Sequence, residues 1–245
     1  MKTLLRSLAV CAVVAASSIT AKAVILSDTY WNFGSNPKHL STNVTGGVMA
    51  AGNFDPLYTP VMNDLGNPSN GYSGINGLSG VHNAAVETKN FAGPITNIVD
   101  ANNPNATYFE FTLAPNPGLQ LVATDFELGS RGKSAFGPTT LTFVASTDSF
   151  SSNITILGSM TLVANNNWAL YNLPSFAYSA PIDTPVTFRI YGTDGIGGTA
   201  SSTWRIDDVT LSVVAVPEPS TYASLLLGVV LLGARALRRR KSAVA

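Results

Sequence analysis

The sequence predicts an all-β protein whose central body is an antiparallel β-sandwich or jelly roll. Past residue 23, apolar and polar residues alternate in short runs, with a period near two and no sustained helical period. Gly, Pro, Asn and Asp separate these runs at intervals of about a dozen residues, which is typical of strands joined by turns. Hydrophobic residues make up 45% of the 245-residue chain, so the apolar surface is sufficient for a substantial core.

Eight runs are predicted to be strands. Those richest in β-branched and aromatic residues, Tyr108–Leu113, Val186–Gly192 and Trp204–Val214, are expected at the centre of the body. The other predicted strands are Val24–Phe33, Leu119–Leu128, Thr140–Ser146, Ile154–Val163 and Trp168–Leu173. Residues 34–106 are rich in turn-forming residues and are expected to be long loops with short strands. The sequence GSRGKS at Gly129–Ser134 is predicted to be a hairpin loop.

The amino terminus has the three-part pattern of a secretory signal peptide. Lys2 and Arg6 precede a short apolar stretch, and small residues follow, so cleavage is expected after Ala23. The alternative is a retained anchor, but this apolar stretch is too short to cross the ~30 Å hydrocarbon core as a helix. Cys11 is the single cysteine and lies in this segment, so the mature protein is expected to have no disulfide.

The carboxyl terminus combines a proline-rich linker, an apolar run and a basic cluster. Residues 219–234 carry no charge and would measure about 24 Å as a helix, which is enough for one crossing with some local thinning of the bilayer. The alternative, a buried amphipathic helix, would show a polar face that this run lacks. The basic residues that should keep the tail cytoplasmic are Arg235, Arg238, Arg239, Arg240 and Lys241.

The predicted domain organisation follows from these signals. It comprises a signal peptide (1–23), a β-sandwich body (24–214, loop-rich over 34–106), a linker (215–221), a transmembrane helix (222–237) and a basic cytoplasmic tail (238–245). The charges are segregated in the same way. Residues 24–216 hold 6 Lys/Arg against 13 Asp/Glu, a net charge of −7, and residues 217–245 have a net charge of +4. Six scattered bases cannot form a phosphate-binding face, so nucleic acid is not an expected partner.

The carboxyl terminus resembles the PEP-CTERM family of bacterial surface proteins. The residues that carry this resemblance are VPEPSTYA at 216–223, the Leu/Val/Gly run after them and the final basic cluster. The resemblance implies a Gram-negative-type host and an exosortase that recognises Pro217, Glu218 and Pro219 and removes the helix. It also implies delivery to the cell surface, often together with exopolysaccharide. Residues 106–214 more weakly resemble the sandwich bodies of such proteins, which look like carbohydrate-binding jelly rolls.

Several acidic residues invite a chemical role. Asp207 and Asp208 are adjacent, but neighbouring strand residues face opposite sides unless a bulge intervenes. One of them is therefore expected to pair with Arg189 or Arg205. Two alternatives remain: a calcium site that also uses Asp194, and acid–base catalysis. The calcium candidates are therefore Asp194, Asp207 and Asp208.

Other side chains offer little catalytic chemistry. His39 and His82 lack the flanking residues of a zinc or triad motif, so they are expected to be ordinary surface histidines. Trp31 and Trp204 suit a core, and Trp168 follows three asparagines in a predicted turn, where it could stack on a sugar. No cofactor or catalytic residue is predicted. We expect a non-enzymatic surface or matrix protein that contacts exopolysaccharide or surface proteins; the alternative is a secreted glycan-active hydrolase.

Overall fold

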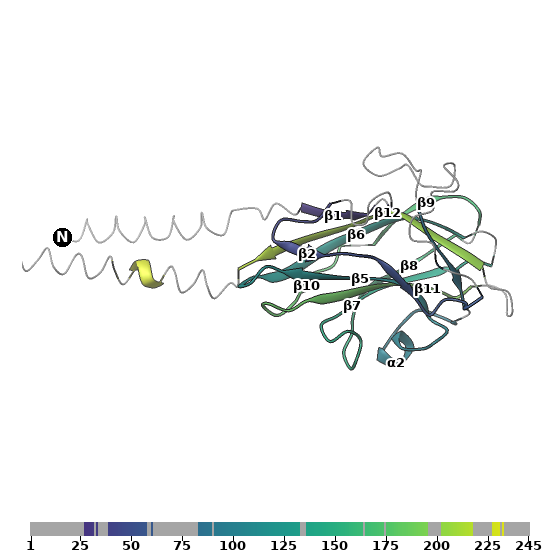
Figure 1. Cartoon of the computed structure of the whole chain (residues 1–245), viewed down its shortest axis with the longest axis horizontal. Coiled ribbons are helices and arrows are strands. Elements are labelled where there is room, and N and C mark those ends of the chain that lie inside the picture. The colour runs from purple at the N-terminus through teal and green to yellow at the C-terminus, as the bar shows by residue number, and fades with distance from the viewer. Residues whose placement is uncertain are drawn as a thin grey trace, which may run out of the picture. The chain divides into compact units, whose positions relative to one another are not determined.

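The structure is a computed structural model, which describes residues 27–31, 33, 39–57, 60, 83–89, 91–132, 136–163, 165–173, 175–195, 202–217, 227–230 and 232. Leu26–Val216 form one compact unit, and the terminal segments fall outside it. Within this unit, strands form two six-stranded sheets in which every described pairing is antiparallel (Figure 1). The predicted all-β antiparallel class is therefore confirmed.

One sheet is built around β12 and is called here the β12 sheet. Its order is β1-β12-β6-β10, with β4 also on β12 and β9 also on β6. Its strands are β1 (Ser27–Trp31), β4 (Ala84–Thr88), β6 (Gln120–Gly132), β9 (Ala169–Leu173), β10 (Tyr178–Ser179) and β12 (Ser202–Val216).

The other sheet is called here the β11 sheet. Its order is β2-β5-β11-β7-β8, with β3 also on β5. Its strands are β2 (Val44–Gly46), β3 (Ala50–Gly52), β5 (Thr107–Pro115), β7 (Thr140–Ser146), β8 (Thr155–Thr161) and β11 (Val186–Thr193). One helical turn, α2 (Ile98–Ala101), precedes β5 and is capped by Asn97. The strands predicted to be central are indeed interior ones, β5, β11 and β12.

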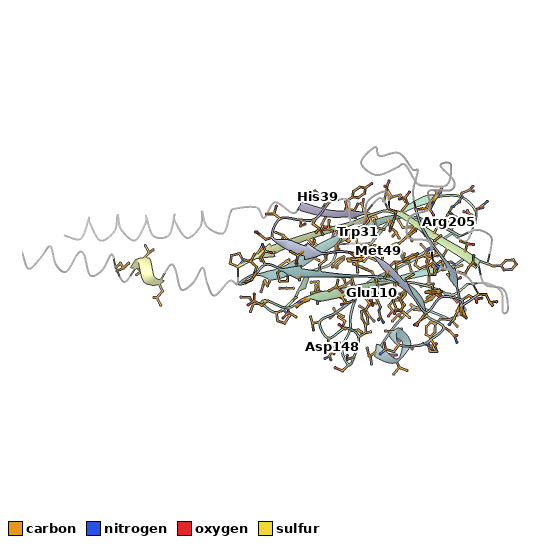
Figure 2. The ribbon with its side chains drawn as sticks, in the orientation of Figure 1. Trp31, His39, Met49, Glu110, Asp148 and Arg205 are labelled. Atoms are coloured by element: carbon orange, nitrogen blue, oxygen red, sulfur yellow. The ribbon has the colours of Figure 1, made fainter. Side chains whose placement is uncertain are left out.

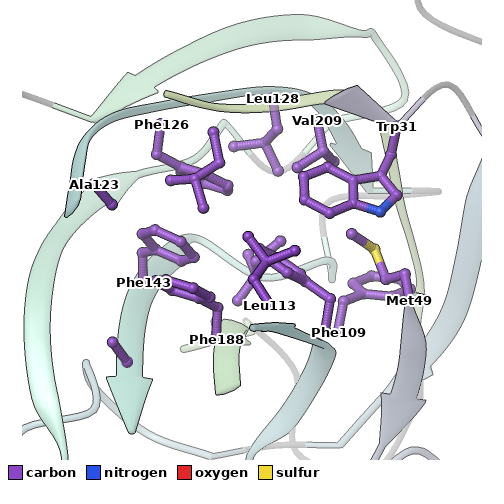
Figure 3. Packing of buried hydrophobic residues seen from close by; sticks show 14 of the residues in the cluster. Trp31, Met49, Phe109, Leu113, Ala123, Phe126, Leu128, Phe143, Phe188 and Val209 are labelled. Atoms are coloured by element: carbon purple, nitrogen blue, oxygen red, sulfur yellow. The ribbon is translucent and has the colours of Figure 1, made fainter. Parts of the chain in front are cut away.

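The core lies between the two sheets, where alternate side chains of each strand meet (Figure 3). Phe126 of the β12 sheet stacks on Phe143 of the β11 sheet, with ring centroids 4.0 Å apart. Phe109 of the β11 sheet packs against Trp204 of the β12 sheet in a tilted arrangement, with ring centroids 4.9 Å apart. Rings that bury so much apolar area account for much of the stability of a small sandwich. Both Trp31 and Trp204 are fully buried, so their predicted core role is confirmed.

Two local predictions need correction. Gly129–Gly132 continue β6 rather than forming a hairpin loop, because they pair with β12 as far as Trp204↔Gly132. This extended ladder overrides the low strand propensity of glycine. β12 ends at Val216 rather than Val214. The loop-rich region contains three short strands, β2, β3 and β4, among its described residues.

The two terminal signals fall largely outside the described residues. Residues 1–23, the predicted signal peptide, lie wholly outside them. Within the predicted transmembrane helix, residues 227–230 and 232 are described and helical, and Leu227, Val229, Val230 and Leu232 are exposed. Among the described residues, no helix is long and apolar enough to cross a membrane.

Candidate functional site

The Pro-Glu-Pro element of the predicted sorting motif begins where the sandwich ends. Val216 is the last residue of β12 and pairs with Gln120 of β6, and Pro217 follows directly. Proline has no amide hydrogen, so Pro217 cannot extend the ladder as a donor. Glu218, Pro219 and the basic residues Arg235, Arg238, Arg239, Arg240 and Lys241 lie outside the described residues.

Asp207 and Asp208 lie at a β-bulge in β12. The register of β12 against β6 shifts between Asp207 and Thr210, and Asp208 has a φ of 47°. This extra residue resets the alternation, so the core-facing positions before and after the bulge are Ile206 and Val209. Both aspartates are almost completely buried, at 1% and 2% exposure. The bulge that would allow these two carboxylates to lie close together is therefore present.

The partner of Asp208 is a tyrosine from the other end of the chain. The Tyr30 hydroxyl donates to Asp208 Oδ1 at 2.5 Å, and the Asp208 amide donates to Asp207 Oδ1 at 2.8 Å. Burial, and then the hydrogen bond to the Asp208 carboxylate, raise the pKa of Tyr30 well above its usual value. Tyr30 therefore stays protonated and serves as a permanent donor to the buried carboxylate. The sequence gives no local signal for this contact, because 178 residues separate the two positions.

The predicted pairing of these aspartates with Arg189 is wrong. Arg189 lies on β11 of the other sheet, where Nε donates to Glu110 Oε2 at 2.6 Å. Its guanidinium also lies 4.0 Å from the centroid of the Tyr108 ring and 3.9 Å from that of Phe150. Glu110 is the direct cross-strand neighbour of Arg189, so the pair follows from the register of β5 and β11.

Arg205 and Asp194 each have a hydrogen-bond partner on another segment of the chain. Arg205 Nη1 donates to Asn83 Oδ1 at 3.0 Å. Asp194 follows β11, where its Oδ1 accepts from the Gly93 amide at 3.4 Å. In the part of the chain that the structure describes, no three His, Cys, Asp or Glu side chains are grouped to hold a metal ion. Among the described residues, the predicted calcium site therefore has no group of three such side chains to support it.

Trp168 lies just before β9 and is half-buried. The guanidinium carbon of Arg131 lies 5.1 Å from its ring centroid, as in a cation–π contact. The preceding residues, Asn165 to Asn167, form a bend in which Asn165 Oδ1 accepts from the Asn167 amide at 2.9 Å. Trp168 is thus a partly accessible aromatic ring next to amide side chains.

A hollow of about 270 Å³ lies where β2, β3 and the residues between them run alongside β5. It is lined by Gly46, Gly47, Val48, Ala50, Glu110, Phe111 and Thr112. Its one carboxylate, Glu110, is already paired with Arg189. A glycosidase needs two carboxyl groups across its cleft.

His39 lies apart from this hollow on the exposed surface (Figure 2). Its Nδ1 atom is 2.8 Å from the carbonyl oxygen of Asp28.

Several of the solved structures that the chain is similar to contain carbohydrate-binding modules. A CBM4 module is 8% identical and aligns over 69% of this chain and 94% of its own, with a TM-score of 0.35. The CBM22-1 xylan-binding domain of Paenibacillus barcinonensis Xyn10C is 8% identical and aligns over 77% of this chain and 94% of its own, with a TM-score of 0.36. The CBM22-1–GH10 modules of Clostridium thermocellum Xyn10B are 13% identical and align over 76% of this chain and 28% of their own, also with a TM-score of 0.36. At these scores the likeness carries no argument about a ligand.

Sequence comparison gives a sharper result at the carboxyl terminus. No curated protein matches the chain. Residues 215–241 match the PEP-CTERM protein-sorting motif, which overlaps the last two residues of β12 and covers the linker, the apolar run and the basic cluster. This match confirms the resemblance found in VPEPSTYA. The chain therefore carries a PEP-CTERM protein-sorting motif, which continues directly from the last strand of a β-sandwich.

Proposed function

We propose that this protein is exported, held in the membrane by its tail and processed by an exosortase that delivers the β-sandwich to the cell surface. The observation that carries the proposal is the sorting motif at residues 215–241. The signal-peptide pattern over residues 1–23 supports export, and the basic cluster after the apolar run supports an orientation with the body outside.

The end of β12 supports processing of a fully folded body. The ladder with β6 includes Val216, and the motif's Pro-Glu-Pro begins at the next residue. A proline on each side of Glu218 disfavours helix and sheet, so this peptide is suited to an extended conformation in a protease. Cleavage beyond Pro217 would leave every described strand of the sandwich intact.

At the surface, the sandwich acts as a non-enzymatic contact module for exopolysaccharide or neighbouring surface proteins. Its half-buried Trp168, beside three asparagines, offers a ring face and amide groups of the kind that contact sugars. Hydroxyl and amide groups dominate its polar surface, because only 11% of residues are charged. The pairing of Glu110 with Arg189 in the hollow supports binding rather than acid–base chemistry there.

The sorting half of the proposal is tested by Glu218→Ala in a host that carries an exosortase. Uncleaved protein should accumulate in the inner membrane, because the change removes the charged residue of the recognised motif. Ser220→Ala, just outside Pro-Glu-Pro, is the matched control and should be processed normally. Fractionation and intact mass give the readout, and normal surface display of the Glu218 variant would overturn the proposal.

The glycan half is tested by affinity electrophoresis through gels that contain the host exopolysaccharide. Trp168→Ala should remove the retardation of the wild-type protein. Leu170→Ala is the control, since Leu170 is an exposed apolar residue two positions away. If the wild-type protein migrates freely, the polysaccharide contact is wrong and the sorting proposal is unaffected.

A further inference from the structure

One side of the sandwich contains the outer strands of both sheets. β8 is the last strand of the β11 sheet, while β9 and β10 pair only with β6 among the described strands. These edges lie close together, because the Val163 amide just after β8 donates to the Tyr171 hydroxyl of β9 at 2.9 Å. We call β8, β9, β10 and the segments that join them the neutral side.

The neutral side has no charge to protect it. Residues 149–182, which include all three strands, contain no Asp, Glu, Lys, Arg or His. Natural sheets usually guard an exposed edge with charges, prolines or bulges, since unpaired backbone groups can bind another strand. The opposite edge of the β12 sheet follows this rule, with Asp28 on β1 and Glu87 on β4. The other edge of the β11 sheet is interrupted between β2 and β3.

The neutral side also exposes apolar side chains. Ile156, Val163 and Leu170 are 41%, 58% and 45% exposed. β8 does carry one protective feature, a bulge at Leu157, where its register with β7 shifts. Beyond the bulge, Gly158–Thr161 pair regularly with β7 over four residues, and this segment contains neither proline nor charge. An exposed edge of this composition is suited to bind another strand.

We propose that the partner is a second copy of this chain, whose β8 pairs antiparallel with the first through Gly158–Thr161. Where two identical antiparallel edges meet across a two-fold axis, the side chains nearest the axis lie beside their own counterparts, so a charge there would face a like charge. The absence of charge over residues 149–182 removes this penalty. The pairing would join two β11 sheets into one continuous sheet and would cover Ile156 and Val163.

This inference rests on the part of the proposed function that assigns contacts between surface proteins. It does not depend on polysaccharide binding or on exosortase cleavage. A dimer can therefore be tested on the full-length chain in detergent micelles, before any processing takes place. Failure of the Glu218→Ala test with an intact dimer would overturn the sorting proposal alone.

Cysteine cross-linking tests the geometry. In a Cys11→Ala background, Ser159→Cys places a thiol on β8 close to the proposed axis, and Thr45→Cys places one on β2, at the opposite edge of the same sheet. Both native residues are exposed. Oxidation of full-length protein in micelles should give a covalent dimer for Ser159→Cys and none for Thr45→Cys. Equal cross-linking at both positions, or none at Ser159→Cys, would overturn the proposal.

A charge at the edge provides an independent test. Thr161→Lys should weaken association at least tenfold, because two lysines are brought near one axis, while Thr45→Lys should leave association unchanged. Sedimentation equilibrium in density-matched detergent should give about twice the chain mass for the wild type. A monomeric wild type, or a Thr161→Lys variant that associates as the wild type does, would overturn the proposal. Processing of both variants should stay normal, which separates this result from a sorting defect.

Discussion

The hydroxyl of Tyr30 donates a hydrogen bond to the carboxylate of Asp208, which joins the first described strand to a bulge in the last. Both side chains are buried, at 6% and 2% exposure. A buried carboxylate requires hydrogen-bond donors, and Asp208 obtains one from β1. The contact therefore makes the position of β1 at the edge of the β12 sheet dependent on a polar group as well as on packing.

Tyr30→Phe should lower the free energy of unfolding by about 1–3 kcal/mol, because the change removes one donor from a buried carboxylate. Urea unfolding followed by near-ultraviolet circular dichroism measures the effect. Thr155→Val, at the exposed start of β8, is the control and should change stability by less than about 0.5 kcal/mol. Equal stability of Tyr30→Phe and the wild type would show that this hydrogen bond contributes nothing.

Arg189→Met should lower the free energy of unfolding more, by about 2–4 kcal/mol, because the charge-assisted hydrogen bond to Glu110 and the contacts with two rings disappear together. The Phe150 ring lies against Arg189, so amide hydrogen exchange should also accelerate around Phe150. Glu110→Gln leaves Arg189 in contact with the rings of Tyr108 and Phe150, so it should lower the free energy of unfolding by less than Arg189→Met does. Unchanged exchange around Phe150 in Arg189→Met would contradict this role of the guanidinium.

Asp148→Asn should show a pH-dependent effect. Hydrogen bonds from the hydroxyls of Ser152 and Ser146, and from the amides of Ser152 and Asn153, lower the pKa of Asp148. A carboxyl whose folded pKa is depressed stabilises the fold fully above its unfolded pKa, about 3.9, and this contribution is lost as the pH falls further. The wild type should therefore exceed Asp148→Asn in urea midpoint at pH 7, and the gap should shrink below about pH 4. If the difference in urea midpoint between the wild type and Asp148→Asn stays constant from pH 7 to pH 2.5, the Asp148 carboxylate is not its source.

Deletion of residues 217–245 should leave the melting temperature within about 2 °C of the wild type, because β12 keeps its last register pair, Val216↔Gln120. The shortened protein should also be released past the membrane. Deletion of residues 214–245 is the matched comparison, since it removes three further residues paired with β6. The protein with this longer deletion should have a clearly lower melting temperature. Two equally stable deletions would mean that the end of β12 does not contribute to the fold.

The alternation of side chains predicted most strands well. Residues Thr140–Ser146 were predicted as a strand with the bounds that β7 has, and Val186–Gly192 match β11 to within one residue. In both strands alternate residues, such as Leu141 and Phe143 or Phe188 and Ile190, belong to the core between the sheets, and this period of two is visible in the sequence. Gly129–Gly132 were misread because local glycine content says nothing about a partner strand more than 70 residues away.

The polar contacts were harder to predict than the strands. A bulge between Asp207 and Thr210 depends on the length of the opposite strand, and no local motif encodes it. The pair Glu110–Arg189 depends on the register between β5 and β11, which sequence alone left open. The Pro-Glu-Pro motif, in contrast, is read as a contiguous peptide, so the sequence was sufficient to find it.

The direct junction of β12 with the sorting motif also determines how the folded body responds to a pulling force. A load on the tail enters at Pro217 and runs along β12, which is bonded to β6 over eleven register pairs and to β1 and β4 on its other side. Antiparallel hydrogen bonds lie perpendicular to the strands, so such a load shears many of them at once instead of opening them one after another. Because forced unfolding is governed by the unfolding rate, this arrangement would give a protein held by its tail mechanical resistance at the point of attachment.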